Sequence, residues 1–391
     1  MTSSAGYSSS PQAFIQSVDT LTITFLVDNC IEWMTKLPPG FTHEMRQHLV
    51  DHSPPKDPRT GVPMLDFERL CCGAHGFSAL IETQTHGFKR HLTLFDTGPD
   101  SSSLVRNIDS MRVPVNEIDR VVLSHWHSDH TGGLLSFLRL RGQEPSPCIV
   151  DAHPSRPIAR GIAPPPAYES IIGRLPNDPT FALIEEAGGK IEYHTDGHAV
   201  ADDTIWVSGE IPRLTPFEDG LPGGMRWVEE QGEGRWVQEH HIMDERYVAI
   251  DVYGKGLVIL SACSHAGIVN VVKDATSKFS RPIHMIIGGL HLAGPELTNR
   301  ISPTVEFLSQ ELRPAPMYIL PMHCSGFQAK IALETAFGEG CVPAGVGIKV
   351  DVLGNREVNK RMIAPRLVPF PQRTSFLLVA IYVVLLGCII T

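Results

Sequence analysis

The chain has 391 residues, 42% of them hydrophobic and 19% charged, so it is long enough for a large buried core and ordinary in composition for a globular protein. Its formal net charge is −10 and it has no run of lysine or arginine, which argues against nucleic acid as the main partner. Eight cysteines without a CxxC pair indicate a reducing compartment, such as the cytoplasm, rather than a disulfide scaffold.

The two ends of the chain differ from the rest. Residues 1–18 predict a flexible lead, because the first ten lack the basic and apolar parts of a signal peptide. Residues 356–375 predict a linker, and 376–391 a hydrophobic tail. As a helix, its uncharged part would rise roughly 22 Å, which is short against a hydrocarbon core of about 30 Å. We therefore leave open a membrane anchor with the main body in the cytosol, a buried final element, or an error in the gene model.

Residues 19–355 carry the pattern of one α/β domain. Runs of β-branched and apolar residues predict strands. These strands are expected at 21–28, 77–82, 91–95, 121–124, 148–152, 204–208, 247–252, 257–260, 283–287, 317–320 and 347–352. Helices are expected at 101–110, 131–140, after His265 to about 279, at 303–312 and at 326–337. Strands dominate first and then alternate with helices, which predicts two sheets packed face to face with helices outside.

Two segments interrupt this pattern. Residues 154–180 are rich in proline and predict a loop excursion, and the glycine-rich residues 213–243 around Trp227 and Trp236 predict an irregular insertion or lid. We expect both to be insertions into one domain, because the histidines on either side of them need one another.

The strongest motif is His-x-His-x-Asp-His at 125–130, which follows a buried strand. In an extended turn, side chains two residues apart face the same way, so His125 and His127 can reach one ion while Asp129 and His130 turn toward a second. Imidazole nitrogen and carboxylate oxygen are ligands that zinc accepts at about 2.0–2.2 Å. The alternative, a solvated histidine-rich loop, does not require this position at the end of a strand.

Residues 124–133 resemble the signature of the metallo-β-lactamase superfamily, and Asp96 matches the acidic residue that the family carries in an earlier turn. Further segments resemble one branch, named for an archaeal synthase that joins a dihydropterin to a ribofuranosylaminobenzene phosphate. These segments are 75–76, 208–213, 260–270, 287–292 and 321–326. The resemblance implies a four-layer αββα sandwich, and it implies that Asp96 orients a metal-bound histidine.

The resemblance also extends the ligand set. Most family members place a third histidine before a strand and an aspartate on the next strand; here Gly209-Glu210 fills the first position and 262–265 the second. His265 would replace the usual ligand, and His323 matches the last family ligand. The implied metal ligands are His125, His127, Asp129, His130, His265 and His323. Cys263 is expected beside these ligands, as a thiolate ligand, a bridging group or a buried cysteine. Two divalent ions are expected; zinc is the first choice, and the ligand types also admit iron or manganese.

Four residues are expected to bind substrate. Arg213 can fork onto a phosphate or carboxylate, unless it forms a surface salt bridge. Glu210 is expected as a support or ligand, and His291 and Asn270 are expected to face the substrate. Asp129 and His291 are the expected catalytic residues, with Asp129 passing a proton to the leaving group.

Two cations roughly 3.5–4 Å apart can share a water molecule and lower its pKa to about 7. This chemistry predicts a hydrolase that acts on a small anionic ester or phosphoester. Two alternatives stay open: a transferase in which an aryl amine displaces pyrophosphate from a dihydropterin, and a non-catalytic metal-binding protein. Besides the small anionic substrate, the hydrophobic tail leaves a membrane as a possible partner.

Overall fold

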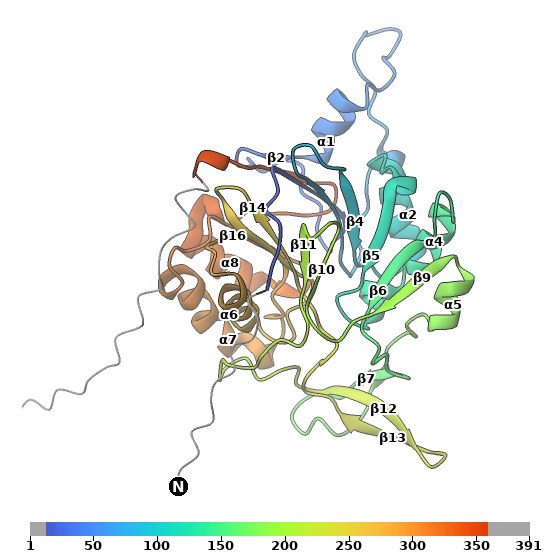
Figure 1. Ribbon diagram of the computed structural model, residues 1–391, viewed down its shortest axis with the longest axis vertical. Helices are drawn as coiled ribbons and strands as arrows, with labels where there is room; N and C mark the ends of the chain where they lie inside the picture. Colours follow the sequence, from blue (N-terminus) through green and yellow to red (C-terminus); the bar gives the residue numbers. More distant parts are fainter. Residues whose placement is uncertain (1–12, 359–391) are drawn as a thin grey trace, which may run out of the picture.

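The computed structural model describes residues 13–358 (Figure 1). The predicted hydrophobic tail, most of the linker and the first part of the lead lie outside these residues. Within residues 13–358, no helix is both long enough and apolar enough to cross a bilayer.

The first central layer is an eight-stranded sheet in the order β2-β18-β1-β3-β4-β5-β6-β9. Its strands are β1 (Thr20–Val27), β2 (Phe41–Thr42), β3 (Ser78–Gln84), β4 (His91–Phe95), β5 (Ile118–Val122), β6 (Cys148–Ala152), β9 (Gly189–Tyr193) and β18 (Lys349–Leu353). Strand β18, near the end of the described residues, pairs antiparallel with β1, so strands from both ends of the domain lie side by side in one sheet. Strands β4, β5, β6 and β9 run parallel, which puts their carboxyl ends at one edge.

The second central layer is a six-stranded sheet in the order β10-β11-β14-β15-β16-β17. Its strands are β10 (His198–Val200), β11 (Ile205–Val207), β14 (Val248–Val252), β15 (Gly256–Ser261), β16 (Ile283–Gly289) and β17 (Tyr318–Met322). Strands β15, β16 and β17 are parallel, so their carboxyl ends also share one edge. Apolar side chains from both sheets, including Phe25 and Ile81 on one side and Ile250 and Leu260 on the other, fill the space between them.

Helices cover the outer face of each sheet (Figure 1). Helices α2 (Ser101–Ser110), α4 (Leu134–Arg141) and α5 (Phe181–Glu186) pack on the first sheet, and α6 (Ile268–Phe279), α7 (Thr298–Glu306) and α8 (Phe327–Phe337) pack on the second. Asp100 caps α2 by accepting from Ser103 N, and Leu104 and Ile108 lie one turn apart on its buried face. The predicted four-layer αββα arrangement is confirmed.

The two insertions are not irregular, so the loop prediction for them was wrong in part. They pair with each other in a small antiparallel sheet of order β13-β12-β7-β8, which projects at the bottom of Figure 1. Its strands are β7 (Arg160–Ile162), β8 (Gly173–Arg174), β12 (Gly224–Glu230) and β13 (Glu233–Gln238). Trp227 lies opposite Trp236, with ring centroids 5.4 Å apart, and such aromatic pairs stabilise a hairpin.

Candidate metal centre

The predicted site residues gather where parallel strands of the two sheets end. The turn after β4 carries Asp96, and the segment after β5 leads into the short helix α3 (Ser128–Thr131). The segments after β15, β16 and β17 carry Cys263 and His265, His291, and His323. The carboxyl ends of parallel strands are the usual location of sites in α/β proteins.

Close packing of two turns fixes the end of α3, where Gly132 follows the last helical residue. A Cβ at Gly132 would lie 1.9 Å from the Pro99 carbonyl oxygen, so a side chain at this position would push the turn after Asp96 away from the motif. The glycine therefore lets the Asp96 turn and the histidine motif approach each other.

One group of three histidines, called the first ligand group, consists of His125, His127 and His265. His125 Nε2 lies 2.9 Å from His127 Nδ1 and 3.2 Å from His265 Nε2. Nitrogens around a tetrahedral zinc ion at about 2.0 Å would be about 3.3 Å apart, so these spacings fit. Burial lowers the pKa of His127 to about 3 and holds the pKa values of His125 and His265 well below their ordinary value. All three rings are therefore neutral, as metal binding requires.

A hydrogen-bond chain fixes the tautomer of His125. The Ser124 hydroxyl donates to Asp96 Oδ2 at 2.6 Å, so its oxygen accepts from His125 Nδ1 at 2.8 Å. With its proton on Nδ1, His125 presents a lone pair on Nε2 to the other two histidines.

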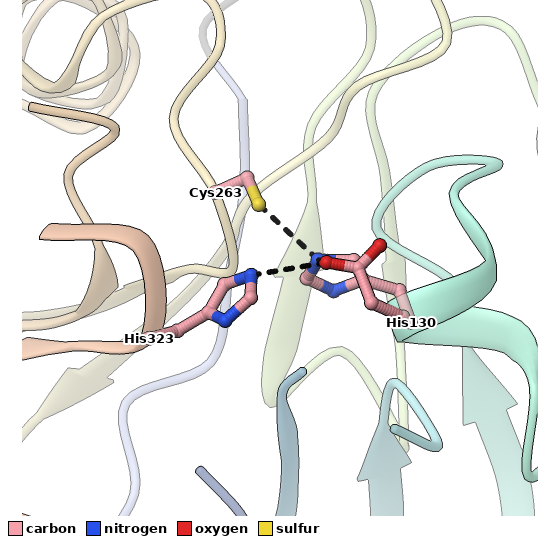
Figure 2. Close-up of side chains that lie close together, drawn as sticks. His130, Cys263 and His323 are labelled. Atoms are coloured by element: carbon pink, nitrogen blue, oxygen red, sulfur yellow. Dashed lines mark hydrogen bonds and ion pairs between the residues drawn. The ribbon is translucent and has the colours of Figure 1, made fainter. Parts of the chain in front are cut away.

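The second ligand group consists of Asp129, His130, Cys263 and His323. His130 Nε2 lies 3.2 Å from Cys263 Sγ, and His323 Nε2 lies 3.3 Å from Asp129 Oδ2. Figure 2 shows His130, Cys263 and His323 converging from three separate segments of the chain. Imidazole, thiolate and carboxylate together form a suitable ligand set for a borderline cation such as zinc.

Both histidines of the second ligand group are oriented by hydrogen bonds from their Nδ1 atoms. His130 Nδ1 donates to Asp96 Oδ2 at 2.7 Å, so one carboxylate serves both ligand groups. Asn29 Oδ1 accepts from the Gly76 backbone N–H, which identifies that atom as oxygen, so His323 Nδ1 donates to it at 3.0 Å. The lone pair on His323 Nε2 then points inward, and this buried atom has no hydrogen-bond partner within residues 13–358.

Charge in the second ligand group is strongly coupled. Burial alone would raise the pKa of Asp129, but His130 and His323 outweigh it and hold this pKa well below its ordinary value. Burial opposes a charge on His130, but Asp129 and Asp96 outweigh it and raise the pKa of His130 to about 9. A cation that binds here therefore takes the place of a proton on His130.

Four residues at the centre have left-handed backbone conformations. The φ values are +60° for Asp96, +58° for Ser264, +46° for His291 and +44° for His323. Such conformations cost non-glycine residues about 1–3 kcal/mol each and cluster at functional sites. The surrounding fold therefore stabilises a ligand arrangement that the local sequence disfavours.

Behind the motif lies a buried ionic network that the sequence did not indicate. Asp244 accepts from Trp126 N at 2.7 Å, and Arg160 donates to Trp126 O at 2.5 Å, so both hold the residue between the two motif histidines. Arg160 is also paired with Asp244 and Glu239. Arg160 belongs to β7, so the small sheet is joined to the ligand loop. Glu245 accepts from the backbone N–H groups of His265 and Ala266 and fixes the other side of the first ligand group.

Both ligand groups open into one cavity of about 570 Å³, a size typical of small-molecule sites. Asp129, Cys263, His265 and His323 contribute to its floor. Residues of the two insertions, among them Ile162, Leu175, Leu221, Met225 and Ile242, form much of its wall. The insertions therefore help to enclose the metal centre.

Sequence and structure comparisons agree with this geometry. The family model described as "Metallo-beta-lactamase superfamily" matches residues 76–215. A Methanocaldococcus jannaschii protein named 7,8-dihydropterin-6-methyl-4-(beta-D-ribofuranosyl)-aminobenzene-5'-phosphate synthase is 32% identical over 269 residues, which cover 68% of this chain and 85% of that protein.

This chain belongs to the metallo-β-lactamase superfamily.

Two further matches fit this membership. An uncharacterised protein of the same archaeon is 30% identical over 279 residues, covering 70% of this chain and 93% of that protein. A solved structure described as a metal-dependent hydrolase of the beta-lactamase superfamily matches with a TM-score of 0.57 and 20% identity, over 85% of this chain and 99% of that one. At this identity, the solved structure supports the fold alone.

The superfamily's divalent metal ions are compatible with the residues present. Two adjacent groups offer seven ligand atoms, and the hydrogen bonds of Asp96, Ser124 and Asn29 leave the ring nitrogens of three histidines free to bind. The first ligand group leaves one tetrahedral position open, as catalytic zinc sites do.

Of the four residues that were expected to bind substrate, one lines the cavity. His291 lines the cavity, but Arg213, Glu210 and Asn270 are not among its lining residues. The Asn270 side chain is held inside α6, where it donates to Ala266 O and accepts from Leu214 N. Glu210 is exposed, whereas Arg213 has buried Nε and Nη1 atoms that lack a hydrogen-bond partner among the described residues. A substrate role for these three residues stays a prediction.

Two residues that line the cavity were not predicted as site residues from the sequence. His75 lies against His323, with ring centroids 4.8 Å apart, and its Nε2 is 3.7 Å from Asp129 Oδ2. Cys324 Sγ lies 3.6 Å from Cys263 Sγ. Both residues stand within segments that resemble the superfamily branch, which was the available signal for them.

Proposed function

We propose that this chain is a dinuclear, metal-dependent hydrolase that acts on a small anionic ester or phosphoester. The supporting observation is the pair of ligand groups, with inward-facing lone pairs, on the floor of one cavity. When bound, two divalent cations lower the pKa of water and polarise a carbonyl or phosphoryl oxygen.

The chain's own residues supply proton transfer in this proposal. Asp129 is ionised and partly accessible from the cavity, so its carboxylate accepts a proton from an attacking water molecule and returns it to the leaving group. Asp96 keeps the protons of His125 and His130 on the side away from the cavity, directly for His130 and through Ser124 for His125.

The cavity wall narrows the proposed substrate class. Among the described residues that line the cavity, the only arginine or lysine is Arg160, and its guanidinium is already paired with Glu239 and Asp244. We therefore expect a substrate whose only negatively charged group is the one that binds at the cations. Leu221, Ile242 and other apolar side chains favour an apolar body for the rest of the substrate.

Turnover of a panel of aryl and acyl esters, phosphomonoesters and phosphodiesters, with and without chelator, tests the proposal. We expect hydrolysis that chelation abolishes and zinc or manganese restores. His127→Ala is expected to lower kcat/KM by at least about a hundredfold, because it removes a proposed ligand. The control His86→Ala changes a surface turn and is expected to leave turnover unchanged. Metal-independent turnover, or normal turnover in a folded His127→Ala protein, would overturn the proposal.

A transferase is the second candidate, and the 32% identity to the archaeal synthase favours it. Incubation with a dihydropterin carrying a diphosphate leaving group, with and without an aryl amine, separates the two activities. A coupled product that forms only with the amine supports the transferase, and leaving-group release without amine supports the hydrolase. Bound metal without either reaction supports a non-catalytic protein.

A further inference from the structure

A third cluster of metal-binding side chains lies beside the second ligand group. Cys263, His291 and Cys324 each offer one ligand atom, and these three atoms lie within 4.8 Å of one another. All three residues line the same cavity. They come from the loops after β15, β16 and β17, so three parallel strands bring them together.

The sulfur positions fit a shared cation. Cys324 Sγ and Cys263 Sγ are 3.6 Å apart. Two thiolates on a tetrahedral zinc ion, with Zn–S bonds of about 2.3 Å, would place their sulfurs about 3.8 Å apart. A disulfide would require about 2.05 Å. The observed spacing is that of a thiol–thiol hydrogen bond, and it is also compatible with two ligands on one ion.

Two features of the backbone and one free nitrogen support the same assignment. A Cβ at Gly289 would lie 2.6 Å from Cys324 Sγ, so the glycine makes room for this sulfur next to Cys263. The backbone of His291 has a left-handed conformation, with a φ of +46°, and such strained residues cluster at functional sites. Its buried Nδ1 has no hydrogen-bond partner among the described residues.

We propose that Cys263, His291 and Cys324 form a third cation site, suited to a soft divalent ion such as zinc or cadmium, with Cys263 bridging to the second ligand group. Two thiolates and one imidazole favour such ions over magnesium or calcium, which prefer oxygen ligands. His291 then binds metal rather than substrate. This assignment does not depend on which reaction the cavity catalyses.

Metal content of the full-length protein tests the third site. The protein is stripped with a chelator under reducing conditions, titrated with zinc, and analysed by elemental mass spectrometry. We expect three equivalents for the wild type and two for both Cys324→Ser and His291→Ala. The control Cys148→Ser changes a buried cysteine in β6, remote from the cavity, and is expected to retain three. Two equivalents in the wild type, unchanged in Cys324→Ser, would overturn the proposal.

Two further measurements test the third site: cobalt absorption, which compares the wild type with Cys324→Ser, and alkylation, which needs the wild type alone and so does not depend on the folding of a variant. Cobalt-loaded wild type is expected to show thiolate-to-metal absorption that falls by roughly two-thirds in Cys324→Ser, because loss of the third ion removes two of the three metal–sulfur bonds. In the wild type, zinc is expected to protect Cys324 from alkylation, as read by peptide mass spectrometry. Equal alkylation of Cys324 with and without zinc would contradict a ligand role.

Discussion

The Ser124 hydroxyl lies 2.6 Å from the Asp96 carboxylate and carries the influence of that carboxylate to His125. Asp96 contacts His130 directly, so a single buried side chain sets the tautomers of one histidine in each ligand group. We expect Ser124→Ala to weaken metal binding by about 10–100-fold at the first ligand group only, and Asp96→Asn to weaken it at both. Competition with a zinc chelator measures the two affinities.

The control for this comparison is Ser309→Ala, because the Ser309 hydroxyl donates to the Val305 carbonyl one turn earlier in its own helical segment. Equal losses in both affinities for Ser124→Ala would contradict the relay from Asp96 through Ser124.

The buried pairing of Arg160 with Asp244 gives a stability prediction. Arg160→Met leaves Asp244 buried without its main partner, and breaking such a pair by removing one member costs about 3–5 kcal/mol. Urea unfolding of the metal-loaded protein measures this change. Arg235→Met breaks an exposed ion pair with Glu230 and is expected to cost less than about 1 kcal/mol. A similar small change in both variants would show that the buried network contributes little.

The pKa of Glu218 predicts a pH dependence of folding. Glu218 accepts from the backbone N–H groups of Val269 and Asn270 at the beginning of α6, but burial outweighs these bonds and raises its pKa from 4.5 to about 7. Between these two values the folded chain keeps a proton that the unfolded chain has released, so stability falls as pH rises through this range. The total loss is on the order of 3 kcal/mol.

Urea unfolding at pH 5, 6, 7 and 8 measures this effect in Glu218→Gln and in the wild type. This pH range contains the titration of Glu218 in the folded chain. Glu218→Gln is expected to lose this part of the slope, whereas Glu311→Gln, at an exposed position, is expected to keep it. An unchanged slope in Glu218→Gln would assign the pH dependence to other groups.

The apolar wall predicts a specificity effect. Leu221 lines the cavity from the second insertion, so Leu221→Ala removes apolar contact with the substrate body and is expected to raise KM about tenfold for an aryl ester. Metal content is expected to stay unchanged. Leu214→Ala removes an exposed leucine that does not line the cavity and serves as the control. Equal KM values for the two variants would place the substrate body elsewhere.

Local patterns were enough to predict the architecture and the histidine motif. Strand runs such as 91–95 and 148–152 carry the pattern of buried strands, and the spacing of His125, His127 and His130 follows from backbone geometry over six residues. The alternation of strands and helices also indicated the layers, because each element must bury one apolar face.

Contacts between distant residues could not be predicted in this way. Asn29 orients His323 across 294 positions of sequence, and no local pattern around Asn29 indicates this contact. The pairing of β7 with β12 depends on register between two loops whose proline and glycine content indicated only irregular backbone. Arg213 was a reasonable candidate for anion binding by residue type, but only the three-dimensional structure shows that it is not among the residues that line the cavity.

The pairing of β7 with β12 also limits how this protein can be divided or recombined. Each insertion supplies a strand that the other needs, so deleting either one exposes an unpaired strand edge that is prone to aggregation. Deleting the first insertion would also remove Arg160 of β7, and the Trp126 carbonyl would lose the hydrogen bond that it accepts from Arg160. A chimera that grafts a relative's loops onto this scaffold must therefore exchange both insertions together, with Asp244 and Glu239 as part of the transferred unit.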